Sequence, residues 1–130
     1  MAVAEGGICE MSKVDVEVLR RKLNESVEVV EETFADFHLQ VRGYGFCGIS
    51  EDSGWMQLLM EIASESGEKL EGNVEIKVNF YDKEGVIIYY CDSYVCDEFF
   101  SGYDTIHKCL NEDNLAFNVA RCKIFATKGC

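Results

Sequence analysis

Residues 74–81 alternate strictly between two kinds of side chain, with valine, isoleucine, valine and phenylalanine at the even positions and more polar residues between them. Successive side chains of a β-strand point to opposite faces, so this pattern predicts a strand with one buried face. A polar turn follows at 82–85, where Gly85 suits a positive φ, and residues 86–91 are rich in β-branched and aromatic side chains. The two segments predict a β-hairpin, and the chain must therefore build a sheet around it.

Other short segments predict further strands. Residues 33–41 and 103–110 alternate, and residues 115–127 offer a face of small or apolar side chains at Ala116, Ala120, Cys122, Ile124 and Ala126. Residues 55–63 fit a strand or a two-turn helix, and the glycine-rich stretch 42–48 fits a loop or a bulged strand. About seven short strands separated by turns predict an all-β protein, an immunoglobulin-like antiparallel β-sandwich.

The N-terminal part divides into three pieces. Residues 1–12 are small and aperiodic, which predicts a flexible tail. Residues 14–24 fit a strand or a short helix, and the helix is predicted over 15–24, while 27–31 favour a strand. At 130 residues the chain is long enough for one domain, so residues 13–130 are predicted to form a single β-sandwich domain.

The charge restricts the class of partner. Twelve basic and 24 acidic side chains give a net charge of −12, which argues against a nucleic-acid backbone or an anionic membrane as the main partner. The apolar runs fall far short of the roughly 20 residues that a membrane-spanning helix needs, so no membrane insertion is expected. Residues 1–13 contain no secretory h-region, which favours the cytoplasm. An extracytoplasmic or cell-envelope location is the alternative if a signal region lies outside this sequence.

The cysteines agree with a reducing compartment. There are seven of them: Cys9, Cys47, Cys91, Cys96, Cys109, Cys122 and Cys130. An odd count does not fit a closed disulfide framework, and free cysteine is often buried as a small hydrophobe. Two or three disulfides in an exported domain are the alternative.

Residues 55–128 resemble the FxLYD family, an uncharacterised group of bacterial domains. The naming motif falls on 78–82 (VNFYD), where Tyr81 and Asp82 match while valine and phenylalanine replace the expected phenylalanine and leucine. Residues 85–87 resemble the restart of the family's next strand, and 100–103 resemble its later glycine turn without the usual proline. Residues 60–64 lack the expected asparagine. The resemblance implies an immunoglobulin-like β-sandwich found in cell-envelope and secreted proteins, with no catalytic residue to transfer.

Two sets of residues are candidates for chemistry that involves thiols. Three cysteines and a histidine could hold tetrahedral zinc, namely Cys91, Cys96, His107 and Cys109. The alternatives are ordinary buried and exposed thiols with a surface histidine, or a Cys91–Cys96 or Cys96–Cys109 disulfide. Cys47, between glycines, could act as a nucleophile with His38 or His107 as base, but no nucleophile-elbow pattern surrounds it.

Two surface features remain. Four acidic side chains around the connection at 91–103 could bind calcium, although with 24 acidic residues in the chain a solvated acidic surface also explains them: Asp92, Asp97, Glu98 and Asp104. Aromatic residues crowd the same region and could form a protein interface or belong to the core: Tyr81, Tyr89, Tyr94, Phe99 and Tyr103.

The function predicted from these features is a non-enzymatic accessory or protein-interaction module with a protein partner and no cofactor. The alternative is a small metal- or redox-linked protein that uses the Cys/His cluster with zinc. A cysteine-dependent enzyme working through Cys47 is a third hypothesis.

Overall fold

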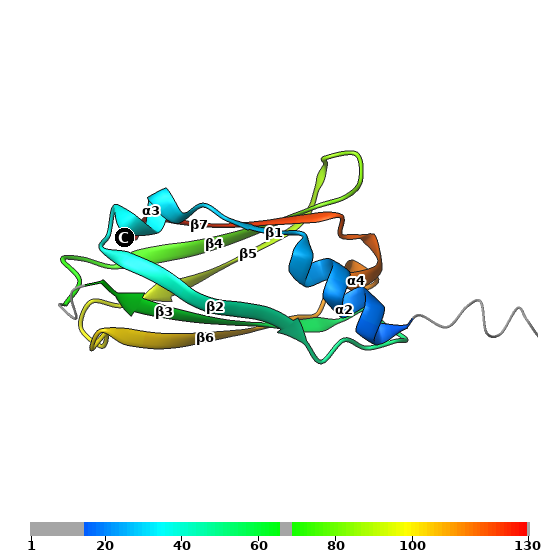
Figure 1. Ribbon diagram of the computed structural model, residues 1–130, viewed down its shortest axis with the longest axis horizontal. Helices are drawn as coiled ribbons and strands as arrows, with labels where there is room; N and C mark the ends of the chain where they lie inside the picture. Colours follow the sequence, from blue (N-terminus) through cyan, green and yellow to red (C-terminus); the bar gives the residue numbers. More distant parts are fainter. Residues whose placement is uncertain (1–14, 66–68, 130) are drawn as a thin grey trace, which may run out of the picture.

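Two β-sheets pack face to face in the computed structural model, which describes residues 15–65 and 69–129 (Figure 1). The first sheet has the strand order β1 (Val27–Val29), β7 (Arg121–Lys128), β4 (Val74–Tyr81) and β5 (Ile87–Val95). The second has the order β2 (Leu39–Cys47), β3 (Met56–Ser64) and β6 (Tyr103–Leu110). This confirms the predicted all-β sandwich of about seven strands. The pairs are antiparallel apart from β1 and β7, which run parallel.

The predicted N-terminal helix is α2 (Val16–Glu25). Its first turn is capped by the Asp15 carboxylate, which accepts hydrogen bonds from the backbone N–H of Glu17 and Val18 at 3.0 and 3.2 Å. The helix packs against β2, where Asn24 Oδ1 accepts a hydrogen bond from Phe46 N–H at 2.8 Å. Within the described ranges, no helix has both the length and the apolar content needed to cross a membrane. The predicted tail at 1–12 lies outside those ranges.

The predicted hairpin is present. All four even-numbered side chains from Val74 to Phe80 are buried, and the turn holds Gly85 at φ 85°. Asp82 Oδ1 closes the turn by accepting hydrogen bonds from the backbone N–H of Glu84 and Val86, each at 2.9 Å. Residues 55–63 form most of strand β3 and not a helix, because its alternate side chains from Met56 to Ile62 all face the other sheet.

Three local predictions were wrong. Residues 33–41 do not form one strand, because α3 (Glu31–Ala35) precedes β2 and buries Phe34, the residue that broke the alternation. Residues 115–127 likewise begin as a short helix, α4 (Leu115–Asn118), so strand β7 starts only at Arg121. Ala116 is buried by α4, whereas Ala120 is exposed and not on the core face. The register of β4 and β5 shifts after Phe80, so that Tyr81 pairs with Ile87 and Phe80 pairs with Tyr89.

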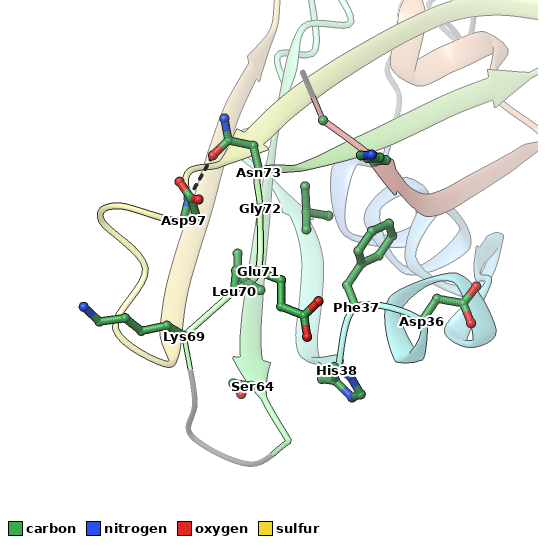
Figure 2. Close-up of a pocket in the computed structure, with 13 residues that line it drawn as sticks. Asp36, Phe37, His38, Ser64, Lys69, Leu70, Glu71, Gly72, Asn73 and Asp97 are labelled. Carbon is green, nitrogen blue, oxygen red and sulfur yellow. Dashed lines mark hydrogen bonds between the residues drawn. The ribbon is translucent and has the colours of Figure 1, made fainter.

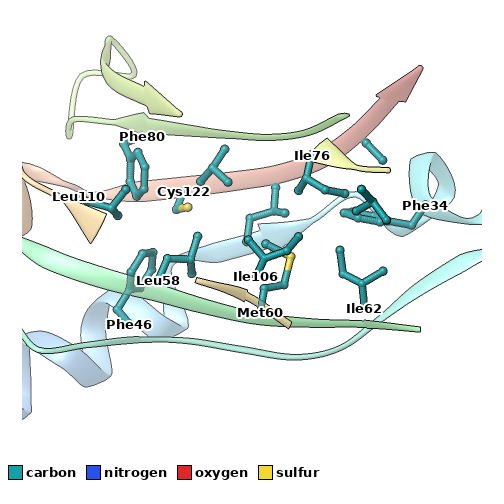
Figure 3. Packing of buried hydrophobic residues seen from close by; sticks show 14 of the residues in the cluster. Phe34, Phe46, Leu58, Met60, Ile62, Ile76, Phe80, Ile106, Leu110 and Cys122 are labelled. Atoms are coloured by element: carbon teal, nitrogen blue, oxygen red, sulfur yellow. The ribbon is translucent and has the colours of Figure 1, made fainter. Parts of the chain in front are cut away.

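The core lies between the sheets, where side chains from both inner faces point toward each other (Figure 3). The Phe80 ring lies 6.0 Å from the Phe46 ring of the opposite sheet and 6.0 Å from the Tyr89 ring of β5. Cys122 and Leu110 are buried in the same cluster. The predicted core face of β7 is correct at Cys122, Ile124 and Ala126.

Candidate functional site

Strand β5 forms one edge of the first sheet. In the described part of the chain it pairs with β4 and with no other strand, over the nine residues Ile87–Val95. The backbone N–H and C=O groups on the outer side of an edge strand lack ladder partners, which makes such an edge a template for another strand. Natural edges are commonly protected by lysine, proline or short length. β5 contains neither lysine nor proline, and Asp92 is its one charged residue.

The outer face of β5 carries exposed aromatic side chains. Its register places Tyr90 opposite Asn79 and Tyr94 opposite Glu75, both of which lie on the solvent face of β4. Tyr90 is 72% exposed and Tyr94 is 51% exposed. Ile87 is also exposed on this strand.

The turn after β5 adds a further aromatic side chain. The backbone N–H groups of Phe99 and Phe100 both donate to Cys96 C=O, at 3.1 and 3.0 Å. Phe100 is buried and anchors this turn, while Phe99 is 82% exposed. We use the name β5 surface for Ile87, Tyr90, Tyr94 and Phe99. These four side chains present apolar area along one open edge.

The aromatic residues predicted as an interface separate into exposed and packed groups. Tyr94, Phe99 and Tyr103 are exposed, and the Tyr103 hydroxyl donates to Glu61 Oε2 at 2.6 Å on the second sheet. Tyr81 is half-buried, with the Arg121 guanidinium 4.3 Å from its ring centroid. Tyr89 faces inward onto Phe80, and burial raises its pKa. Tyr90 was missing from the predicted set, although it lies four residues before Tyr94 on the same strand and therefore points to the same face.

The other long edges are better protected. On β6, Lys108 lies opposite the buried Leu58, so a charged side chain points toward the sandwich interior. Its ammonium group is close enough to Cys91 to lower the pKa of that thiol, although burial dominates and raises it to about 11. On β2, Asn24 from helix α2 binds the backbone of Phe46. An inward-pointing charge and a covering helix are both devices that discourage strand addition.

The structure does not bring the four predicted zinc ligands together. Cys91 lies on β5 opposite the buried Val78, so its side chain faces the core. Cys96 is exposed just after that strand. His107 and Cys109 lie on the outer face of β6, where His107 Nε2 is 2.9 Å from Gln57 Oε1. Within residues 15–65 and 69–129, no three His, Cys, Asp or Glu side chains form a group that could hold a metal ion, which also covers the four acidic calcium candidates.

Burial acts against thiolate formation at two of the described cysteines, Cys91 and Cys122. Cys122 is fully buried, and that burial raises its pKa. Cys47 is half-buried on β2 and lies opposite Gln57 in the register of β2 and β3. Thiolate chemistry is favoured by a lowered thiol pKa, whereas burial raises the pKa of both Cys91 and Cys122.

A pocket of about 690 Å³ opens at one end of the sandwich (Figure 2). Its walls come from the corner between α3 and β2, the segment 69–74 and the ends of β3 and β7. Asn73 Oδ1 accepts a hydrogen bond from Asp97 N–H at 2.9 Å in its wall. Charges of both signs are scattered around it, with Asp36 and Glu71 against Lys69 and Lys128. Because acidic and basic side chains are mixed around the pocket, its lining does not indicate one class of ligand.

Two solved structures are similar to this chain. One is cj0090 from Campylobacter jejuni, with 16% sequence identity and a TM-score of 0.44, covering 78% of this chain and 98% of its own. The other is a DUF1425 family member from Shewanella sp. pv-4, with 11% identity and a TM-score of 0.43, covering 71% of this chain and 79% of its own. No family model and no curated protein matches the sequence.

Proposed function

We propose that this protein is a non-enzymatic interaction module that binds a protein partner through the open edge of β5. The observation that carries the proposal is the β5 surface, where Tyr90 and Phe99 are 72% and 82% exposed beside a nine-residue edge strand. A partner strand could hydrogen-bond along the outer edge of β5 and cover these aromatic side chains in one step. Tyrosine is enriched at interfaces because its ring supplies apolar area while its hydroxyl remains solvated.

The distribution of chemical groups supports a binding role over a catalytic one. The candidate zinc ligands lie on two different sheets, and burial holds the Cys91 pKa at about 11. Of the six exposed aromatic residues in the described ranges, three lie on β5 and the turn that follows it, including the two most exposed, Tyr90 and Phe99; the other three, Tyr44, Trp55 and Tyr103, lie elsewhere. A cofactor therefore forms no part of the proposal.

The FxLYD resemblance gives this role a structural context. Its motif residues lie at the end of β4, where Tyr81 packs under Arg121 and Asp82 closes the hairpin turn. The Asp82 turn joins β4 to β5, whereas the Arg121 contact joins β4 to β7, so the motif residues lie where the strand that we assign to binding leaves the sheet interior. The described cysteines are free, and we propose the reducing cytoplasm as the compartment.

Site-specific photocrosslinking tests the proposal. A benzoylphenylalanine side chain at position 94 is expected to form a covalent adduct with one defined protein in cells that naturally express this chain. The matched control places the same group at Tyr44, an exposed aromatic position on β2 at 41% exposure. Because a bound partner covers β5 and not β2, the adduct at 44 is expected to be absent. Equal adducts at both positions, or no adduct at 94, would contradict the proposal.

A further inference from the structure

We infer that the partner segment is an extended, basic stretch of another protein that adds to the first sheet beyond β5. This inference rests on the proposed function, and it names the chemistry of the partner. Three features of the described residues carry it: the charge around β5, the pattern of its two faces and the repulsion that a second copy would meet.

The segment that contains β5 is strongly negative, although Lys77 of β4 lies opposite Asp92. Residues 82–100, which comprise β5 and the turns on both sides, contain five acidic side chains and one basic side chain. Asp92 is exposed on the same face of β5 as Tyr90 and Tyr94, and Glu84 and Glu98 are exposed beyond the two ends. A lysine- or arginine-bearing segment would be attracted by this field and would find Asp92 near the middle of the strand.

The two faces of β5 require different side chains from an added strand. The inward positions Tyr89 and Cys91 are half-buried and pack against the core, so apolar side chains next to them would extend that core. The outward position Asp92 lies opposite Lys77 of β4 on one side, and a basic residue of an added strand would flank it on the other side. An added strand that alternates apolar and basic residues meets both requirements at once, because the period of a strand is two.

A second copy of this chain fits the same edge poorly. If two β5 strands paired with each other, two copies of the segment 82–100 would meet, each with five acidic side chains and one basic side chain. Each whole molecule also carries a net charge of −12. Like charges on adjacent strands are destabilising. The charge therefore favours a basic partner over self-association.

A pair of capped nine-residue peptides tests the inference on the full chain. One peptide alternates valine with lysine, and the control alternates valine with glutamate. Amide hydrogen exchange, read residue by residue by NMR, is expected to slow along β5 with the lysine peptide and not with the glutamate peptide. Asp92→Lys is expected to weaken binding of the lysine peptide by about fivefold or more. The control Asp104→Lys, at an exposed acidic position on β6, should change binding less than about twofold.

The outcomes separate the inference from the proposed function. If the glutamate peptide protects β5 equally well, the basic partner class is wrong while strand addition at β5 stands. If the lysine peptide binds but protects residues other than β5, or if Asp104→Lys weakens it as much as Asp92→Lys, the binding follows overall charge and the inference fails. If neither peptide protects β5 at millimolar concentration, both proposals fail. Protection of β5 that grows with protein concentration alone would assign the edge to a second copy.

Discussion

Replacing Phe80 with alanine is expected to lower the free energy of unfolding by about 3–5 kcal/mol. Phe80 is 0% exposed, and its ring lies 6.0 Å from both Phe46 and Tyr89. Truncation removes the apolar area that joins the two sheets and leaves a cavity which the flanking strands can fill only in part. Urea denaturation followed by circular dichroism gives the change directly, provided that the slope of the transition is unchanged.

Tyr90→Ala is the matched control for this loss. Tyr90 is also aromatic and lies on the strand next to Phe80, but its side chain is 72% exposed. Its replacement is expected to change the free energy of unfolding by less than about 1 kcal/mol. Similar losses for the two variants would show that Phe80 does not occupy the centre of the sandwich.

Replacing Gly54 with alanine is expected to cost about 2–4 kcal/mol. Gly54 has φ 74°, and a Cβ at this position would lie 2.7 Å from Asn114 Cα and 2.9 Å from Asn114 C. These are backbone atoms, which cannot rotate away as a side chain can. The Gly54 carbonyl also accepts a hydrogen bond from Ala116 N–H at 3.0 Å, so the clash would disturb the contact between the start of β3 and helix α4. Thermal unfolding should show the loss as a lower Tm.

Gly85→Ala separates the two causes of that loss. Gly85 has φ 85°, but a Cβ there would meet nothing within 4 Å. This variant therefore reports the backbone strain alone, about 1–2 kcal/mol. A loss for Gly54→Ala no larger than that for Gly85→Ala would mean that the packing against Asn114 is looser than the structure shows.

The parts of the fold that local patterns predict are those in which one face of a strand is buried and the other is solvated. The even-numbered positions of β4 and β3 belong to this class, and so does the hairpin turn ending at Gly85. Helix α3 was missed because its stability depends on a distant contact. Thr33 Oγ1 accepts a hydrogen bond from Ala126 N–H at 3.0 Å, and these residues are 93 positions apart in the chain.

The candidate site was predictable only in its composition. Aromatic residues between 81 and 103 suggested an interface, but the sequence did not show which of them point outward. A register irregularity after Phe80 decides that Tyr89 faces the core and Tyr90 faces solvent. The open edge itself depends on strand order. β4 lies between β5 and β7, so the sheet continues beyond β4 and ends at β5. Strand order is a tertiary property that the alternation of side chains does not encode.

Amide hydrogen exchange of the free protein, measured at low concentration, shows directly whether the edge of β5 is open. Half of the N–H groups of an edge strand point away from the sheet and exchange readily, while those of an inner strand are bonded on both sides. We therefore expect alternating fast and slow exchange from Tyr89 to Val95 and uniform protection along β4, which pairs with both β5 and β7. Uniform slow exchange along β5 in the free protein would mean that the edge is already covered, and it would contradict this account.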